Sequence, residues 1–179
     1  MEAVVAVVRL DPRNGEPISR KAEAGIRMLR CEKTQIETFT DVDFAMCVQR
    51  RLCASDTYCG WIDSTLFYVQ GWVHALDKNP RAGSPHRLAV DKVIPVNVSA
   101  LVGEAATLTG AFQIIVYDLL KNQVACIVDR TASRPIYYYL DENLLILSSD
   151  IRAIVGIPGL DFSIDIAALV QFIRVQTIM

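Results

Sequence analysis

Cysteine and histidine are the residues of this chain whose chemistry could drive covalent catalysis. Cys59 lies beside Gly60 and Trp61, and the two histidines are His74 and His86. A thiol that works with a histidine base is an activated nucleophile. No motif places either histidine beside the thiol, so the alternative is an inert cysteine that packs as a small apolar residue.

The spacing of the cysteines favours neither a metal site nor a disulfide framework. Cys47, Cys53 and Cys59 are six residues apart, which on one regular strand would put them on a single face. No C-x-x-C pair and no zinc-type histidine spacing accompanies them. The odd total of 5 argues against a disulfide framework. We therefore expect all of them, Cys31 and Cys126 included, to be reduced and buried.

The elements that must position any site are clearest between Gly110 and Ile154. Apolar runs alternate here with turn-prone residues, which predicts four strands followed by a short helix that ends near Gly156 and Pro158. Ser148 or Ser149 is the expected N-cap of that helix. The predicted strands are 111–117, 124–128, 136–140 and 144–147, with the first two forming a hairpin.

Charged residues follow the second of these strands. Asp129 and Arg130 are adjacent, and Arg134 comes four residues later, ahead of Tyr137. Opposite charges at a strand end favour a structural ion pair that the later residues could join. Such a network preserves a fold without doing chemistry.

These segments resemble, in order, the second half of the class II glutamine amidotransferase domain. The resemblance is carried by GAF at 110–112, YD at 117–118, DR at 129–130, RPIYY at 134–138 and SSDIRA at 148–153. That domain opens asparagine synthetases, β-lactam synthetases and lasso-peptide cyclases. The resemblance implies an α+β fold, the four-layer αββα sandwich of two antiparallel sheets found in N-terminal nucleophile hydrolases.

The nucleophile of that family is missing. Active members carry a cysteine as second residue, exposed as the new N-terminus when the initiator Met is removed, whereas this chain has Glu2. The chemistry needs a thiolate or hydroxyl beside a free α-amine, and a carboxylate attacks an amide poorly. We therefore expect no catalytic residue here and a glutaminase-dead domain.

The first half of the chain resembles the family more loosely and suggests a vestigial substrate pocket. The strand 44–52 ends in QRRL at 49–52, which resembles the family's His-x-Arg-Leu element, so Arg51 matches the arginine that holds the α-carboxylate of glutamine. Gln70 and Gly71 stand where the family has the Asn and Gly of its oxyanion hole. Asp91 is the candidate for the aspartate that binds the substrate amine. The family's His-Arg-Gly-Pro segment would fall at 30–33 and has been lost.

Two of these residues also have structural interpretations. Arg51 could be a solvated arginine or one that forms a structural ion pair. Gly71 could be retained for backbone geometry, since a glycine within a strand often marks a bulge or a close approach.

Composition indicates a globular domain with a large core. The 179 residues are 52% hydrophobic, with 18 basic and 20 acidic side chains. No basic stripe predicts nucleic-acid binding, and no apolar stretch is long enough for a membrane span. The N-terminus lacks a basic region of the kind that begins a secretion signal, so we expect a cytoplasmic protein.

The end of the chain suggests a partner. We divide the sequence into an amidotransferase-like domain at 1–160 and a C-terminal helix at 161–179, with Ser163 as N-cap candidate and apolar residues along one side. In the family this helix leads to a synthetase domain whose S-G-G-x-D-S loop binds ATP. No such loop occurs here. Cofactors are therefore expected to be absent from this chain, and ATP with Mg to belong to a synthetase domain in cis or in trans. A homodimer is a further possibility.

Two hypotheses of function follow. The first is an inactive domain that supports a ligase which adenylates a carboxylate, of β-lactam synthetase or lasso-peptide cyclase type. The alternative is a degenerate glutaminase or amidohydrolase that supplies ammonia for asparagine synthesis. Glu2 and the lost segment at 30–33 favour the first.

Overall fold

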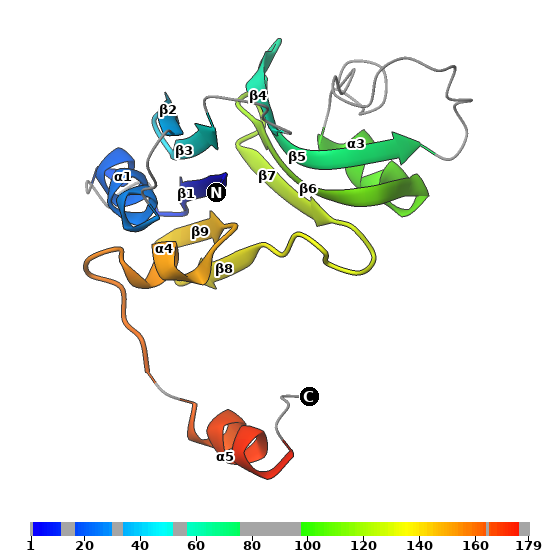
Figure 1. Ribbon diagram of the computed structural model, residues 1–179. Coiled ribbons are helices and arrows are strands. Elements are labelled where there is room, and N and C mark those ends of the chain that lie inside the picture. Colours follow the sequence, from blue (N-terminus) through cyan, green and yellow to red (C-terminus); the bar gives the residue numbers. More distant parts are fainter. Residues whose placement is uncertain are drawn as a thin grey trace.

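The computed structural model describes residues 2–11, 17–29, 34–51, 57–75, 98–163 and 165–175. They form two antiparallel sheets with helices on the outer sides (Figure 1). The predicted α+β sandwich of two antiparallel sheets is confirmed.

The five-stranded sheet has the order β2-β3-β1-β9-β8. Its central strand, β1, is apolar on both faces because each face is covered, one by helices and the other by the second sheet. The register places Val5 opposite Cys47 on one side and opposite Ser148 on the other. The strands are β1 (Ala3–Arg9), β2 (Thr34–Thr40), β3 (Phe44–Arg51), β8 (Tyr137–Leu140) and β9 (Leu144–Ser148).

The four-stranded sheet has the order β4-β5-β6-β7. Its two inner strands are its longest and pair along their whole length, from Thr65 opposite Asp118 to Ala75 opposite Leu108. The strands are β4 (Thr57–Ile62), β5 (Thr65–Ala75), β6 (Leu108–Asp118) and β7 (Gln123–Val128).

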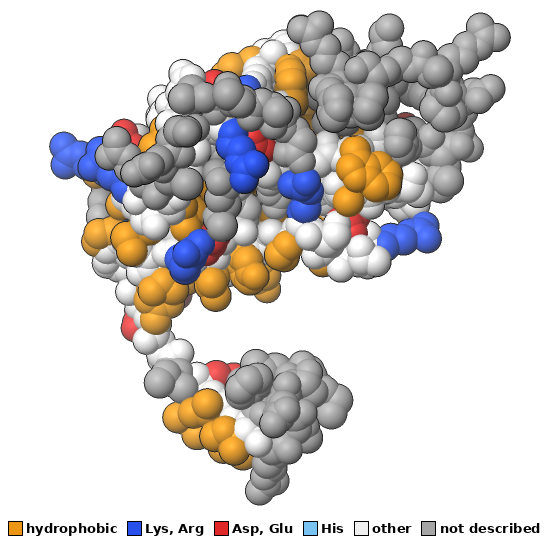
Figure 2. All heavy atoms as spheres, in the orientation of Figure 1, with side chains coloured by type: hydrophobic (Ala, Val, Ile, Leu, Met, Phe, Trp, Pro, Cys, Tyr) orange, Lys and Arg blue, Asp and Glu red, His pale blue; other side chains and the backbone are white. Residues whose placement is uncertain are grey.

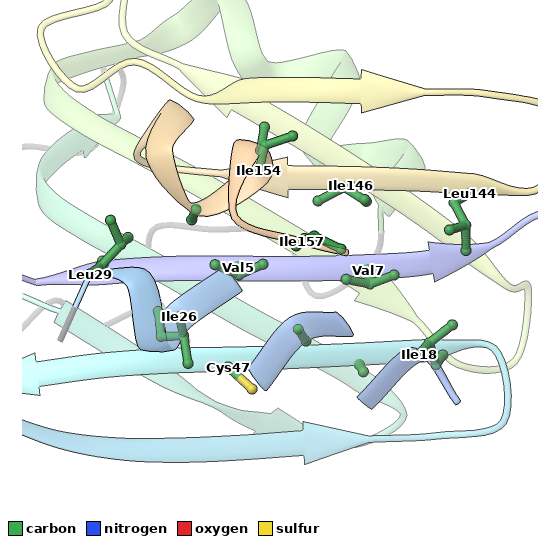
Figure 3. Close-up of a cluster of buried hydrophobic side chains, with 14 residues drawn as sticks. Val5, Val7, Ile18, Ile26, Leu29, Cys47, Leu144, Ile146, Ile154 and Ile157 are labelled. Atoms are coloured by element: carbon green, nitrogen blue, oxygen red, sulfur yellow. The ribbon is translucent and has the colours of Figure 1, made fainter. Parts of the chain in front are cut away.

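Three hydrophobic clusters define the layers. Helices α1 (Ile18–Met28) and α4 (Ile151–Val155) pack on the outer face of the five-stranded sheet, against side chains such as Val5 and Val7 (Figure 3). Helix α3 (Val98–Glu104), which continues into the 3-10 turn η1 (Ala105–Thr107), covers the outer face of the other sheet. The described elements thus stack as helix, sheet, sheet and helix.

The middle cluster joins the two sheets. Alternate residues of β1, Val4 and Ala6, face it and meet Tyr68 of β5 and Ile115 of β6. The ring of Phe44 stacks on that of Tyr117, with centroids 4.0 Å apart. This layer is the apolar centre of the sandwich, and its polar end carries the candidate site.

The predicted order of four strands and a helix after Gly110 is confirmed, but its N-cap was predicted wrongly. Asp150 caps α4, and its carboxylate accepts from the backbone N–H of Arg152 at 2.9 Å. The serines are used elsewhere. Ser149 Oγ accepts from Val4 N–H, and Ser148 Oγ lies 3.0 Å from the carbonyl oxygen of Val4. Both hydroxyls therefore form hydrogen bonds that link the end of β9 to β1.

Helix α5 (Ile166–Val175) lies apart from the sandwich, at the end of an extended segment (Figure 1). One contact on that segment is the edge-on pairing of Phe162 with Tyr139. Apolar side chains are exposed on α5, and others lie on β8 and α4 along the lower edge of the body (Figure 2). None of the described helices is long and apolar enough to cross a membrane.

Candidate functional site

The carboxylate of Glu2 lies at the polar end of the space between the sheets, where three groups of the described residues donate hydrogen bonds to it. Its Oε2 accepts from the hydroxyl of Thr57 at 2.6 Å and from Nε2 of Gln70 at 3.4 Å. Its Oε1 accepts from the backbone N–H of Arg51 at 3.4 Å. The structure therefore brings Glu2 together with two of the predicted pocket residues, Arg51 and Gln70.

Strand register explains why these groups converge. Thr57 of β4 lies opposite Gln70 of β5, which lies opposite Gln113 of β6. Residues directly opposite in a sheet project from the same face, so the three polar side chains form a row. Glu2 immediately precedes β1, the central strand of the other sheet. Its side chain meets the row from the opposite layer.

A buried network fixes the amide of Gln70. Its Oε1 accepts from the hydroxyl of Tyr68 at 3.2 Å and also from Nε2 of Gln113, and all three residues are buried. With its oxygen engaged there, the amide turns its Nε2 toward Glu2. Burial raises the pKa of Tyr68 well above its ordinary value, and the nearby charge of Glu2 raises it further. The phenol consequently stays protonated and remains a donor.

Gly71 adopts a conformation that favours glycine. Its φ is +98°, and the guanidinium of Arg134 lies against the position that a side chain would occupy. Gly110 on the neighbouring strand has φ +137°. This geometry supports the interpretation of Gly71 as a residue retained for its backbone. It also places the guanidinium of Arg134 beside Gly71, the residue that follows Gln70.

The structural ion pair belongs to Arg50. Its guanidinium bonds Glu37 at 2.8 Å and donates to the carbonyl oxygen of Cys59 at 2.9 Å. Arg51 is exposed, and within the described ranges no ion pair of its guanidinium is seen. Of the two structural interpretations of Arg51, its exposure fits the solvated arginine. Successive residues of a strand point to opposite faces, so neighbouring arginines differ completely in environment.

The predicted pair of Asp129 with Arg130 is also wrong. The carboxylate of Asp129, a buried residue, lies over the turn that follows β7. It accepts hydrogen bonds from the backbone N–H groups and the hydroxyls of Thr131 and Ser133. It also accepts from the backbone N–H of Phe112 at 3.3 Å. Arg130 is exposed and donates to the carbonyl oxygen of Ala106. Asp129 prefers local N–H and O–H donors because they lie within the same turn.

These bonds predict a pH-dependent contribution of Asp129 to stability. The hydroxyl of Ser133, then that of Thr131, hold the pKa of this carboxyl well below its ordinary value of 3.8. A depressed folded-state pKa stabilises the fold above the ordinary pKa, and the benefit is lost as the pH falls toward the folded-state value. We therefore expect Asp129→Asn to unfold at lower denaturant concentration than the wild type at pH 7. The difference should shrink steadily below about pH 4.

Denaturant unfolding followed by circular dichroism between pH 3 and pH 7 measures this difference. Glu142→Gln, at an exposed position of the β8–β9 turn, is the matched control and should leave the curve unchanged. A constant difference between Asp129→Asn and the wild type at every pH would contradict the assignment.

The geometry contradicts the pairing of Cys59 with His74. Cys59 lies opposite Tyr68, and His74 is six residues further along β5, which at the rise of a strand is about 20 Å. Burial raises the pKa of the Cys59 thiol to about 12, only partly opposed by the charge of Arg50. The thiol is therefore protonated at neutral pH. His86 lies outside the described residues.

The remaining cysteines differ from the expectation in two ways. Cys47 lies on β3 among the side chains under α1, whereas Cys59 lies on β4 in the other sheet, so the two do not share a face. Cys47 is buried as expected, but Cys126 is exposed. Cys31 and Cys53 lie outside the described residues, as do Asp91 and the segment 30–33. In the described part of the chain no group of His, Cys, Asp or Glu could hold a metal ion.

Sequence reasoning missed three residues of the site, namely Thr57, Tyr68 and Gln113. Tyr68 is two residues before Gln70, and this period of two was the available signal that both face the same layer. Gln113 interrupts an otherwise apolar strand, which is a sign of a buried polar role. Thr57 carried no such signal, since only the register shows what lies opposite it.

Fold and site together define a two-sheet α+β sandwich with a cluster of hydrogen-bonded polar side chains at one end of its central layer. A family model for the glutamine amidotransferase domain matches residues 85–179, slightly more than half of the sequence. The chain therefore belongs to the glutamine amidotransferase domain family. No curated protein sequence matches it significantly. Glu2, Arg51, Gln70 and Gly71 all precede the matched segment.

Proposed function

We propose that this chain is an inactive amidotransferase-like domain with the N-terminal nucleophile type of fold. The observation that carries the proposal is the place of Glu2. It stands at the start of β1, where active relatives have their cysteine, and its carboxylate already engages Thr57, Gln70 and the amide of Arg51. A carboxylate held by donors is stabilised as an anion and is a poor nucleophile.

We further propose that the domain supports a synthetase domain of an asparagine-synthetase-type ligase, of β-lactam synthetase or lasso-peptide cyclase type. That domain would bind ATP and Mg, adenylate a carboxylate and close an amide, in cis or in trans. The proposed division is a domain at 1–160 followed by a connecting helix. Apolar side chains exposed on β8 and α4, and separately on α5, support a docking role, since exposed apolar surface often marks an interface. They are Tyr138, Leu140, Ile151, Val155, Ile166 and Ile173.

Ammonia release from glutamine tests the first part of the proposal. The purified chain should release ammonia no faster than buffer alone, with an active glutaminase as the positive control. Turnover that is lost in Gln70→Ala would favour the alternative, a degenerate glutaminase that uses this pocket to supply ammonia for asparagine synthesis. The inactive assignment would then be wrong.

The second part is tested at the level of the gene. We expect either a reading frame that continues into an S-G-G-x-D-S loop or a neighbouring gene that encodes one. A synthetase of that kind, produced separately, should bind the wild-type chain and lose binding to Ile173→Asp. Equal binding of both variants would show that α5 is not the docking element.

A further inference from the structure

We infer that Thr57, Gln70 and the backbone N–H of Arg51 form a carboxylate-binding site that Glu2 fills from within the same chain. The ligand class is a small aliphatic carboxylate, which takes the place of Glu2 when that side chain is removed. Binding of a carboxylate at this site does not depend on a synthetase partner.

The three donors together form hydrogen bonds to both oxygens of a carboxylate. Thr57 and Gln70 bond Oε2, and Arg51 bonds Oε1. Hydrogen bonds to an ionised acceptor are stronger than those between neutral groups. The 2.6 Å contact with Thr57 is therefore the expected main contribution, and the two 3.4 Å contacts are expected to orient the second oxygen and the plane of the group.

The site is built before a ligand arrives. The donors come from β3, β4 and β5, which belong to two different sheets. Gln70 is only 7% exposed, and its amide is oriented from behind by Tyr68 and Gln113. Donors held in place by packing lose little conformational freedom on binding. Removing the Glu2 carboxylate should therefore leave a formed receptor.

Competition from Glu2 explains why the wild-type chain should not bind an added carboxylate. Glu2 directly precedes the paired strand β1, which holds its carboxylate beside the donors, so its effective concentration lies far above the millimolar value of a group on a flexible linker. A free carboxylate of few atoms gains limited affinity, so its dissociation constant is expected to be about millimolar. Such a ligand binds measurably only when Glu2 is absent.

The test is a titration of the full-length Glu2→Ala chain with sodium acetate, followed by ¹H–¹⁵N spectra. We expect saturable shifts of the Arg51 amide with a dissociation constant of about 1 to 10 mM, and no saturable shift in the wild type. Adding Thr57→Val to Glu2→Ala should weaken acetate binding about tenfold, the usual effect of losing one hydrogen bond to a charged group. Sodium chloride and sodium phosphate at equal ionic strength are the controls.

Several outcomes would overturn the inference. They are the absence of saturable shifts in Glu2→Ala, equal shifts in the wild type, equal shifts with chloride or phosphate, or full binding by the double variant. If Glu2→Ala does not fold, acetate should restore folding, because a ligand that binds only the folded state stabilises it. Failure of acetate to raise the melting temperature above that in chloride would equally reject the site.

Discussion

Replacing Gly71 with alanine is expected to lower the free energy of unfolding by about 2 to 4 kcal/mol, one of the largest effects of any single substitution in this chain. The φ of +98° is strained for a residue with a side chain. In addition, an added Cβ would lie 2.0 Å from the carbonyl oxygen of Ala111. That neighbour is backbone of β6, so it cannot move aside without separating β5 from β6.

Gly103→Ala is the matched control. An added Cβ there meets nothing within 4 Å, and the residue belongs to helix α3. Alanine should therefore stabilise the fold slightly, by about 0.5 to 1 kcal/mol. Urea unfolding followed by far-UV circular dichroism measures both variants. A Gly71→Ala chain as stable as the wild type would contradict the close approach of β5 and β6 at the pocket.

Phe44→Ala is expected to cost about 3 to 5 kcal/mol. Phe44 is fully buried, and its ring stacks on Tyr117 with an interplanar angle of 5°. The two residues come from β3 and β6, so the truncation opens a cavity between the sheets. The hydroxyl of Tyr117 keeps its bond to Asn122 and holds that ring in place, which limits collapse of the cavity.

Two further variants serve as comparisons for the Phe44→Ala result. Phe44→Leu fills much of the same volume and should cost about 1.5 kcal/mol. Val42→Ala, at a 73% exposed position before β3, should change stability by less than about 0.5 kcal/mol. The same urea titrations measure all three. A Phe44→Ala loss no greater than that of Val42→Ala would mean that the two sheets are not packed through this ring.

The sequence predicted the elements whose pattern is local. The strands β6, β7, β8 and β9 were predicted within a few residues of their bounds. Strands β2 and β4 and helix α3 were not predicted. The side chains of β2 and β4 are largely half-buried or exposed, so their apolar pattern is weak. Helix α3 has only seven residues, too few for a clear helical period.

The site was predictable where a family motif names a residue and unpredictable where a contact depends on register. Glu2, Gln70 and Gly71 came from the resemblance. Thr57 lies fifty-five residues from Glu2 in the chain. The two meet because β4 pairs with β5 and the sheet of β5 packs on the sheet of β1. For Asp129, closeness in the sequence suggested the wrong partner. The adjacent Arg130 suggested a pair, but the hydroxyls of the next turn supply nearer donors.

We propose that Glu2 occupies the position of the nucleophile and leaves the site chemically inert. Intact-mass spectrometry after incubation with an electrophilic analogue of glutamine tests it most directly, because an active-site nucleophile would retain the analogue covalently. The full-length chain is predicted to keep its unmodified mass, with an active glutamine amidotransferase labelled in parallel. A single adduct that free glutamine prevents, mapped to any residue of the pocket or to Cys59, would contradict the claim.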